Sequence, residues 1–185
     1  MSSARSIVLI GMMGAGKSSV GRCLERRTGI QRFDIDEIVS ARFQESITEI
    51  FAKLGEEQFR RAETEALASL NPEQPAIIVT GGGIVLREEN VRHLKRLGLV
   101  VWLDAEEAVL FERASRRGNR PLLKTDDPSS TLSKIRTERE NRYAAACDVR
   151  VDTTHNSHEE VADIILAEVD RRAADQPLMQ PDQAE

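Results

Sequence analysis

A run of eight residues, Gly11-Met12-Met13-Gly14-Ala15-Gly16-Lys17-Ser18, has the residue types and the spacing needed to bind phosphate groups. It fits the pattern G-x-x-x-x-G-K-[ST] of the phosphate-binding loop, or P-loop. Its glycines allow backbone N–H groups to turn toward phosphate oxygens without obstruction by a Cβ atom. The Lys17 ammonium can bind the β- and γ-phosphates, and the Ser18 hydroxyl can ligate Mg²⁺. The residues predicted to bind the nucleotide here are Gly11, Gly14, Ala15, Gly16, Lys17, Ser18 and Ser19.

Two carboxylates, those of Asp34 and Asp36, follow a short apolar segment and stand two positions apart. Residues at this spacing in an extended segment point the same way, here toward the ligand edge of the predicted sheet. One carboxylate can organise Mg²⁺ and its waters, while the other accepts a hydrogen bond from an attacking hydroxyl. A helix N-cap at Asp36 and a solvated strand end at Asp34 would explain the same residues without a ligand, so both interpretations stay open here.

Three arginines, Arg60, Arg120 and Arg139, stand at predicted inward-facing or loop positions. A guanidinium offers a planar fork that matches a carboxylate or a phosphate, and so suits both an anionic acceptor and a transferring phosphoryl group. In a chain with many arginines, any single one is more often a solvated surface charge. These residues therefore become site candidates only in combination with the phosphate-binding loop.

Short apolar segments alternate with longer segments of helical period, which is typical of an α/β fold with a mainly parallel sheet. The predicted strands are 6–10, 30–33, 76–80, 99–103 and 149–153. The predicted helices are 17–28, 36–43, 47–54, 56–70, 88–97, 131–146 and 158–172. One further helix is predicted to have Asp104 as its cap and to reach residue 117. The strand over 76–80 ends at Gly81-Gly82-Gly83, and such strand ends are where open α/β sheets bind ligands.

Length, composition and charge limit the class of protein. A chain of 185 residues with 40% hydrophobic residues predicts one domain over residues 1–174, followed by a tail over 175–185 without periodicity. The net charge of −5 disfavours nucleic acid as a partner. No apolar run approaches the ~20 residues that span a bilayer, and no export signal is evident. With only Cys23 and Cys147 available, a disulfide framework is not expected. We therefore expect a cytoplasmic monomer that binds neither nucleic acid nor membrane.

These motifs together resemble the shikimate kinase family in order and spacing, over roughly residues 5–172. The P-loop is shared with many kinases, but its combination with the other motifs is much more specific. The segments that carry the resemblance are Ile10 to Arg22, Phe33-Asp34-Ile35-Asp36, Phe59-Arg60-Arg61, Gly81-Gly82-Gly83, Arg120-Pro121-Leu122-Leu123, and Arg139 with Tyr143.

The resemblance implies a fold, a reaction and a division of the chain. The fold is a P-loop three-layer sandwich of the nucleoside monophosphate kinase type, with a five-stranded parallel sheet, a substrate-binding region over about 34–63 and a lid over about 116–127. The reaction is transfer of the γ-phosphoryl group of ATP to the 3-hydroxyl of shikimate, giving shikimate 3-phosphate and ADP, with Mg²⁺ as cofactor.

The resemblance also implies roles for individual residues. Asp36 would bind the shikimate hydroxyls, Gly82 would complete the pocket, and Arg60 and Arg139 would hold the shikimate carboxylate. Asp34 would support Mg²⁺ beside Ser18. Arg120 would lie on the lid and reach the phosphates. Arg113 would lie against the adenine ring. The second adenine contact, at His158 where the family often has proline, stays open. The implied catalytic residues are Lys17, Asp36 and Arg120.

Two alternatives of different kinds remain at this point. The chain could be another small-molecule P-loop kinase, for gluconate or a nucleoside monophosphate, because these share the loop and the sheet. It could also be a nucleotide-dependent switch without catalysis. The guanine signature N/T-K-x-D is missing, since its nearest match, Leu123-Lys124-Thr125-Asp126, begins with the wrong residue. The arginines favour an acceptor that carries a carboxylate.

Overall fold

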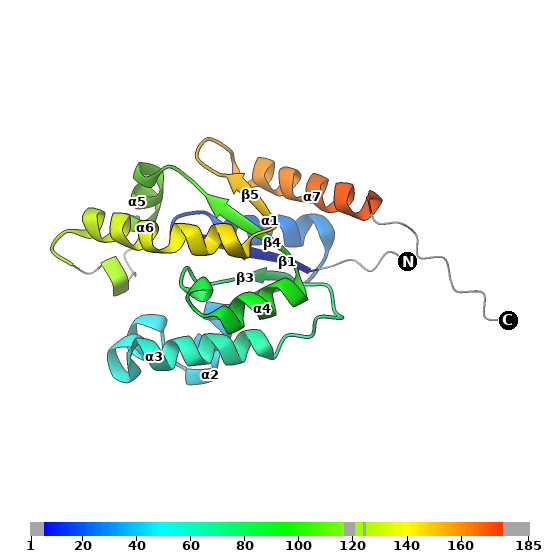
Figure 1. Ribbon diagram of the computed structural model, residues 1–185. Coiled ribbons are helices and arrows are strands. Elements are labelled where there is room, and N and C mark those ends of the chain that lie inside the picture. Colours follow the sequence, from blue (N-terminus) through cyan, green and yellow to red (C-terminus); the bar gives the residue numbers. More distant parts are fainter. Residues whose placement is uncertain (1–5, 117–120, 124, 176–185) are drawn as a thin grey trace.

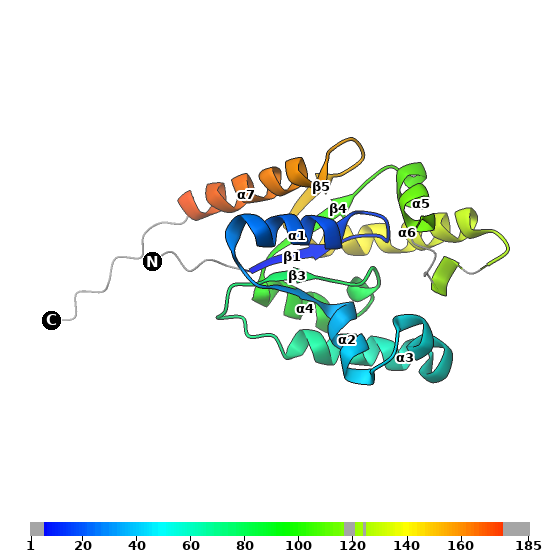
Figure 2. The same cartoon turned by 180° about the vertical axis from the view of Figure 1, so that it is seen from behind.

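A computed structural model describes residues 6–116, 121–123 and 125–175 of the chain. Five strands form one sheet in the order β2-β3-β1-β4-β5, and every neighbouring pair is parallel. Helices α4 and α6 lie in front of this sheet in Figure 1, and α1 lies in front of it when the molecule is seen from behind in Figure 2. The predicted α/β fold with a five-stranded parallel sheet is confirmed. The strands are β1 (Ser6–Ile10), β2 (Arg32–Asp34), β3 (Ile77–Val79), β4 (Gly98–Asp104) and β5 (Val149–Asp152).

The helices begin and end at the residues that cap them. Helix α1 ends at Gly29, whose φ of 70° lies in the left-handed region that glycine favours. A capping box of Ser46 and Glu49 starts α3, and Gly55 interrupts it with φ 80°, so the two helices predicted here are one element with a kink. The helices are α1 (Lys17–Thr28), α2 (Ile35–Phe43), α3 (Ile47–Ala68), α4 (Glu88–Leu97), α5 (Glu107–Ser115), α6 (Pro128–Ala146) and α7 (His158–Ala174), with single 3₁₀ turns at Ile84–Leu86 and Pro121–Leu123.

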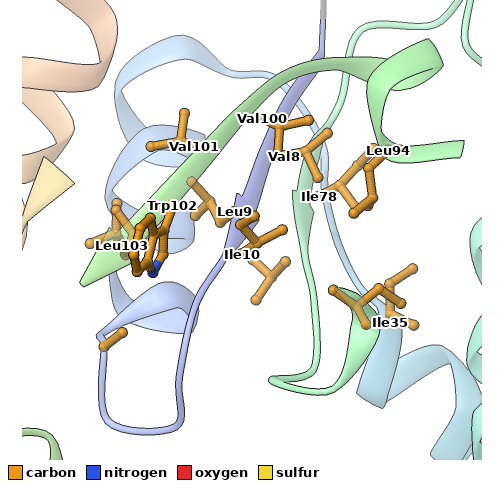
Figure 3. Close-up of a cluster of buried hydrophobic side chains, with 14 of the residues drawn as sticks. Val8, Leu9, Ile10, Ile35, Ile78, Leu94, Val100, Val101, Trp102 and Leu103 are labelled. Carbon is orange, nitrogen blue, oxygen red and sulfur yellow. The ribbon is translucent and has the colours of Figure 1, made fainter. Parts of the chain in front are cut away.

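The core is centred on β1 and β4, which pair along their length (Figure 3). All of β1 is buried, and Val8, Leu9 and Ile10 have no exposed surface. Burying one aliphatic side chain of this size contributes about 1.5–3 kcal/mol, so the central strands are firmly fixed. Because the loop that follows β1 leaves this part of the sheet, the phosphate-binding loop has a rigid base.

Asp104 does not cap a helix, contrary to the prediction. It is the last residue of β4, and α5 begins only after Glu106. The chain stays extended here because Thr153 N–H donates to the carbonyl of Asp104 (2.7 Å) and Glu106 N–H donates to Thr154 Oγ1 (3.0 Å). The carboxylate of Asp104 instead accepts a hydrogen bond from Arg150 Nη2 at 2.6 Å.

Two predicted segments fall partly or wholly outside the described ranges. Residues 117–120 and 124 of the lid predicted over 116–127 lie outside the described part of the chain. So do residues 176–185 of the predicted tail. Both the lid and the tail stay predictions. Within the ranges that the structure covers, none of the helices has the length and apolar character required to cross a bilayer.

Candidate active site

The P-loop lies between β1 and α1, as predicted. Gly11, Gly14 and Gly16 have φ angles of 137°, 85° and 89°, a conformation that residues with a Cβ rarely adopt. A Cβ on Gly11 would lie 2.2 Å from the Leu103 carbonyl oxygen, and one on Gly14 would lie 2.4 Å from that of Leu110. The loop is therefore packed against β4 and α5 so tightly that only glycine fits at these two positions.

The Lys17 side chain is buried at the first position of α1. Its Nζ donates to the carbonyl oxygens of Gly11 and Met12 at 2.8 and 2.9 Å. The ammonium is thus held inside the curve of the loop by the loop's own backbone. A cation in this position can bind phosphate oxygens placed over the N-terminus of α1, where the helix dipole also favours negative charge.

Ser18 and Asp34 place two oxygens together beside the loop. Ser18 Oγ lies 3.4 Å from Asp34 Oδ2, and Asp34 Oδ1 accepts a hydrogen bond from Asp36 N–H as the N-cap of α2. Burial raises the pKa of Asp34, Glu37 adds to the increase, and Arg32 opposes it. Mg²⁺ usually takes one or two protein oxygens and fills its remaining positions with water and phosphate oxygens. A hydroxyl and a carboxylate at the edge of a phosphate site fit that requirement.

One cavity of about 380 Å³ is lined by the loop and by charged side chains from distant segments. We distinguish two parts of it by their residues. The loop region consists of Gly14, Gly16, Lys17, Ser18, Ser19, Arg113 and His158, and the arginine region consists of Asp36, Arg60, Glu63, Gly81, Gly82, Gly83 and Arg139. The structure therefore brings the predicted residues Asp36, Arg60, Gly82 and Arg139 to the same cavity as Lys17.

Arg60 is buried in α3 between carboxylates and aromatic rings. Its Nη1 donates to Glu63 Oε2 at 2.5 Å, and its Nη2 donates to Glu56 Oε1 at 3.0 Å. The guanidinium lies 5.2 Å from the centre of the Phe59 ring. Burial by itself lowers the pKa of Arg60, but Glu63 and Glu56 outweigh that effect and raise it. The cation is thus fixed in place before any ligand binds.

Glu63 is a residue of this site that the sequence analysis missed. Its side chain has no exposed surface, and its pKa is raised to about 7. Burial is the main cause; the charge of Asp36 adds to it, while Arg60 and Arg139 oppose it. One signal could have revealed it, because Glu63 follows Phe59 by four positions and so lies on the predicted apolar face of the helix. An acidic residue on such a face needs a partner.

The three glycines after β3 leave space for the charged groups of the arginine region. A Cβ on Gly81 would lie 2.6 Å from Glu63 Oε1 and 2.8 Å from Asp36 Oδ1. A Cβ on Gly83 would lie 2.3 Å from Arg60 Cζ. Each of these two glycines therefore makes room for a different part of the charged cluster, which is a physical reason for the run of glycines at this strand end.

The carbonyl of Gly82 holds Arg139 from α6. Arg139 Nη1 donates to this oxygen at 3.0 Å, and the Tyr143 hydroxyl donates to the same oxygen at 2.5 Å. The Nε of Arg139 is buried and has no hydrogen-bond partner among the described residues. Buried polar groups are normally paired, so this donor is suited to an incoming acceptor oxygen.

Arg113 and His158 complete the loop region. Arg113, on α5, donates from Nη2 to the carbonyl of Thr153 at 2.9 Å. This hydrogen bond fixes the Arg113 side chain against the residue that follows β5. The His158 ring, at the start of α7, lies 3.4 Å from the position of a Cβ built on Gly16. Both side chains thus line the cavity beside the P-loop. The predicted catalytic residue Arg120 lies outside the described residues.

Comparison of the sequence with known proteins gives one consistent family. A model of the shikimate kinase family matches residues 13–170. A shikimate kinase from Thermodesulfovibrio yellowstonii is 40% identical over 167 residues, covering 90% of this chain and 96% of that protein.

Solved structures agree with the sequence comparison. The shikimate kinase from Acinetobacter baumannii in complex with shikimate superposes with a TM-score of 0.88 at 31% identity, covering 92% of this chain and 96% of that one. The shikimate kinase from Aquifex aeolicus superposes with a TM-score of 0.77 at 35% identity, covering 92% and 99%. The similarity therefore extends over the sheet and over the elements that line the cavity.

Proposed function

The chain belongs to the shikimate kinase family, and from this membership we propose how its own side chains transfer the γ-phosphoryl group of ATP to the 3-hydroxyl of shikimate. The protein is an ATP-dependent kinase of the shikimate pathway that forms shikimate 3-phosphate and ADP. One observation carries the assignment of residues. The P-loop lysine, the Asp36 carboxylate and two buried guanidinium groups line a single cavity.

The loop region would bind ATP. Backbone N–H groups of the P-loop and the Lys17 ammonium would hold the β- and γ-phosphates at the N-terminus of α1. Arg113, fixed by the Thr153 carbonyl, would lie against the adenine ring. His158 stands at the same part of the cavity and is the candidate for the second contact with the base.

Ser18 and Asp34 would hold Mg²⁺, because their oxygens lie together beside the loop. When bound, Mg²⁺ would neutralise charge on the phosphate oxygens during transfer. Asp34 is suited to this position because the α2 backbone fixes one of its carboxylate oxygens, while Ser18 approaches the other.

The arginine region would bind shikimate. Arg139 uses one N–H of Nη1 for the Gly82 carbonyl, and its buried Nε–H remains for the shikimate carboxylate. Arg60 would be the second cation for this carboxylate, with its position set by Glu63 and Glu56. Asp36 would accept a hydrogen bond from the 3-hydroxyl and take its proton as the bond to phosphorus forms.

Catalysis would come mainly from position and charge. Phosphoryl transfer passes through a loose transition state, so placing the hydroxyl in line and stabilising charge on the transferred group matter more than a strong base. Lys17 would supply this stabilisation from the loop. The lid residue Arg120 is proposed to add to it. Accordingly, we expect Arg120→Ala to lower kcat strongly and to leave shikimate affinity nearly unchanged; equal losses in both would contradict this role.

The assignment of the reaction is tested by ADP formation in a coupled assay with ATP and Mg²⁺. We expect sustained turnover with shikimate and only background hydrolysis without it. Gluconate and a nucleoside monophosphate serve as control acceptors, because they represent the other small P-loop kinases. Turnover with a control acceptor but not with shikimate would contradict the assignment, and binding of ATP without turnover on any acceptor would favour a switch.

We also propose that the protein acts as a monomer in the cytoplasm. The described side chains of both regions of the cavity come from one chain, which supports a site formed within a single subunit. Light scattering during size-exclusion chromatography would test the oligomeric state, with the mass of a single chain as the expected result.

A further inference from the structure

We propose that Tyr143 is a positioning residue for the acceptor, acting through the Gly82 carbonyl and the Arg139 guanidinium. This inference rests on the proposed function, because it takes Arg139 as a cation that binds the shikimate carboxylate. It extends that function by naming the group that sets the position of Arg139. The phenol itself would not touch the substrate.

The contact pattern around Gly82 supports this role. Its carbonyl oxygen accepts hydrogen bonds from Tyr143 Oη at 2.5 Å and from Arg139 Nη1 at 3.0 Å. A carbonyl oxygen has two lone pairs, so two donors satisfy it and fix its direction. Arg139 and Tyr143 lie four positions apart on α6, which places both donors on the same face of that helix.

The phenol is held in a fixed setting of its own. Tyr143 is only 1% exposed, and burial raises its pKa, so the hydroxyl stays neutral and available as a donor. Its ring stacks on Trp102 of β4, with ring centres 5.7 Å apart and 23° between the planes. The Arg150 guanidinium lies 4.5 Å from the centre of the Trp102 ring, and the Asp104 carboxylate holds that guanidinium. This packing leaves Tyr143 little freedom to move.

Gly82 also lies close to the phosphate-binding loop. A Cβ built on Gly82 would be 3.5 Å from the Gly11 carbonyl oxygen, 3.6 Å from Met13 N and 3.6 Å from Tyr143 Oη. The Gly82 backbone therefore lies against both the loop and Tyr143. A shift of this peptide would change the position of Arg139 relative to the P-loop, and in-line transfer depends on that relative position.

The first experiment compares Tyr143→Phe with the wild type and with Leu132→Val. Tyr143→Phe keeps the buried ring and removes only the hydroxyl, while Leu132 is a fully buried residue of the same helix that does not line the cavity. We expect Tyr143→Phe to raise the shikimate KM about five- to tenfold, because the free energy of one hydrogen bond would no longer hold the Gly82 carbonyl, and through it Arg139, in position. The ATP KM and kcat should change less than about twofold. Leu132→Val should leave both KM values unchanged.

The outcomes separate this inference from the proposed function. No turnover of shikimate by the wild type would overturn the proposed function and this inference with it. Wild-type turnover with an unchanged shikimate KM in Tyr143→Phe would overturn this inference alone. Equal rises in both KM values would also overturn it, because they would indicate a general structural effect.

A double-mutant cycle tests whether Tyr143 acts through Arg139. Arg139→Lys keeps a positive charge but removes the planar fork. In that background, Tyr143→Phe should change shikimate affinity by less than about twofold, measured by calorimetric titration without ATP. An undiminished five- to tenfold effect would show that Tyr143 acts independently of Arg139 and would overturn the proposal.

Discussion

The loop region and the arginine region of the cavity are built in different ways. The P-loop is a continuous segment between β1 and α1, and its proposed phosphate-binding groups are backbone N–H groups and the Lys17 ammonium. The arginine region joins side chains of α2, α3 and α6 to the loop after β3, and its cations are already engaged with carboxylates or a carbonyl. Local geometry thus creates one region, while tertiary packing of charged groups creates the other.

This difference predicts how the two regions respond to mutation. Loss of the Lys17 cation in the loop region removes charge stabilisation during transfer and leaves the packed sheet intact. A change in the arginine region disturbs partners that are themselves buried and charged, so it affects folding as well as ligand binding. Four experiments test that contrast, beginning with the largest expected effect.

Lys17→Ala should lower kcat by about 10³-fold, because it removes the cation that stabilises the transferred phosphoryl group. The melting temperature should change little, since the Lys17 Nζ donates to carbonyl oxygens of the loop itself. Lys53→Ala, which removes an exposed lysine of α3, is the matched control and should keep full activity. A large drop in melting temperature for Lys17→Ala would remove the contrast between the two regions.

Arg60→Ala should raise the shikimate KM about 100-fold, as expected when one partner of a charged hydrogen-bonded contact is lost. It should also lower the free energy of unfolding by about 3 kcal/mol, because Glu63 would remain buried without its main cation. The neighbouring Arg61→Ala is the control, since the Arg61 side chain is 69% exposed and that of Arg60 is 8% exposed. Steady-state kinetics and thermal melts of both variants measure the difference; similar behaviour would be evidence against the arginine region.

Gly83→Ala and Gly82→Ala form a matched pair. A Cβ at Gly83 would lie 2.3 Å from Arg60 Cζ, whereas a Cβ at Gly82 would have only ordinary contacts at 3.5 and 3.6 Å. Overpacking costs about 1–3 kcal/mol, so we expect Gly83→Ala to raise the shikimate KM about tenfold by displacing Arg60. Gly82→Ala should stay within about threefold of the wild type. The reverse order would show that Arg60 is free to move aside.

The two regions also differ in how far the sequence predicts them. The P-loop, its flanking strand and helix and the parallel sheet could be predicted because they follow from local spacing and from hydrophobic period. Asp36, Arg60 and Arg139 were candidates from their residue types and positions, but only the family resemblance placed them in one substrate site, since no local pattern shows that three separate segments meet. Glu63 was missed although it lies on the predicted apolar face of α3 and three positions after Arg60. Its complete burial follows from the packing of α3 on the loop after β3, which no local pattern shows. Asp104 was assigned to a helix cap because the pairing that keeps this segment extended comes from β5, far along the chain.

Glu63→Gln should change the pH dependence of stability, which is the smallest of the four effects. The pKa of Glu63 is raised from its ordinary value of 4.5 to about 7 by burial, with the charge of Asp36 adding to it. Between these two values the folded chain holds a proton that the unfolded chain has released, so a rise in pH through this window destabilises the fold. The glutamine variant lacks this proton exchange. Its melting temperature relative to the wild type should therefore increase as the pH is raised from about 4.5 to 7.

Glu65→Gln supplies a control of opposite sign from the same helix. The pKa of Glu65 is lowered, chiefly by its hydrogen bond with Arg42, so its contribution to stability is present above its ordinary pKa and is lost as the pH falls. Removing that contribution should make the Glu65→Gln variant lose stability relative to the wild type as the pH rises toward 4.5. Glu63→Gln should instead gain stability relative to the wild type as the pH rises from 4.5 to about 7. Thermal melts of the three proteins from below pH 4.5 to about pH 7 measure both slopes, and the other titrating groups are common to all three. Parallel slopes for the two variants would mean that Glu63 titrates as an ordinary surface carboxylate, which would be incompatible with a buried charged cluster in the arginine region.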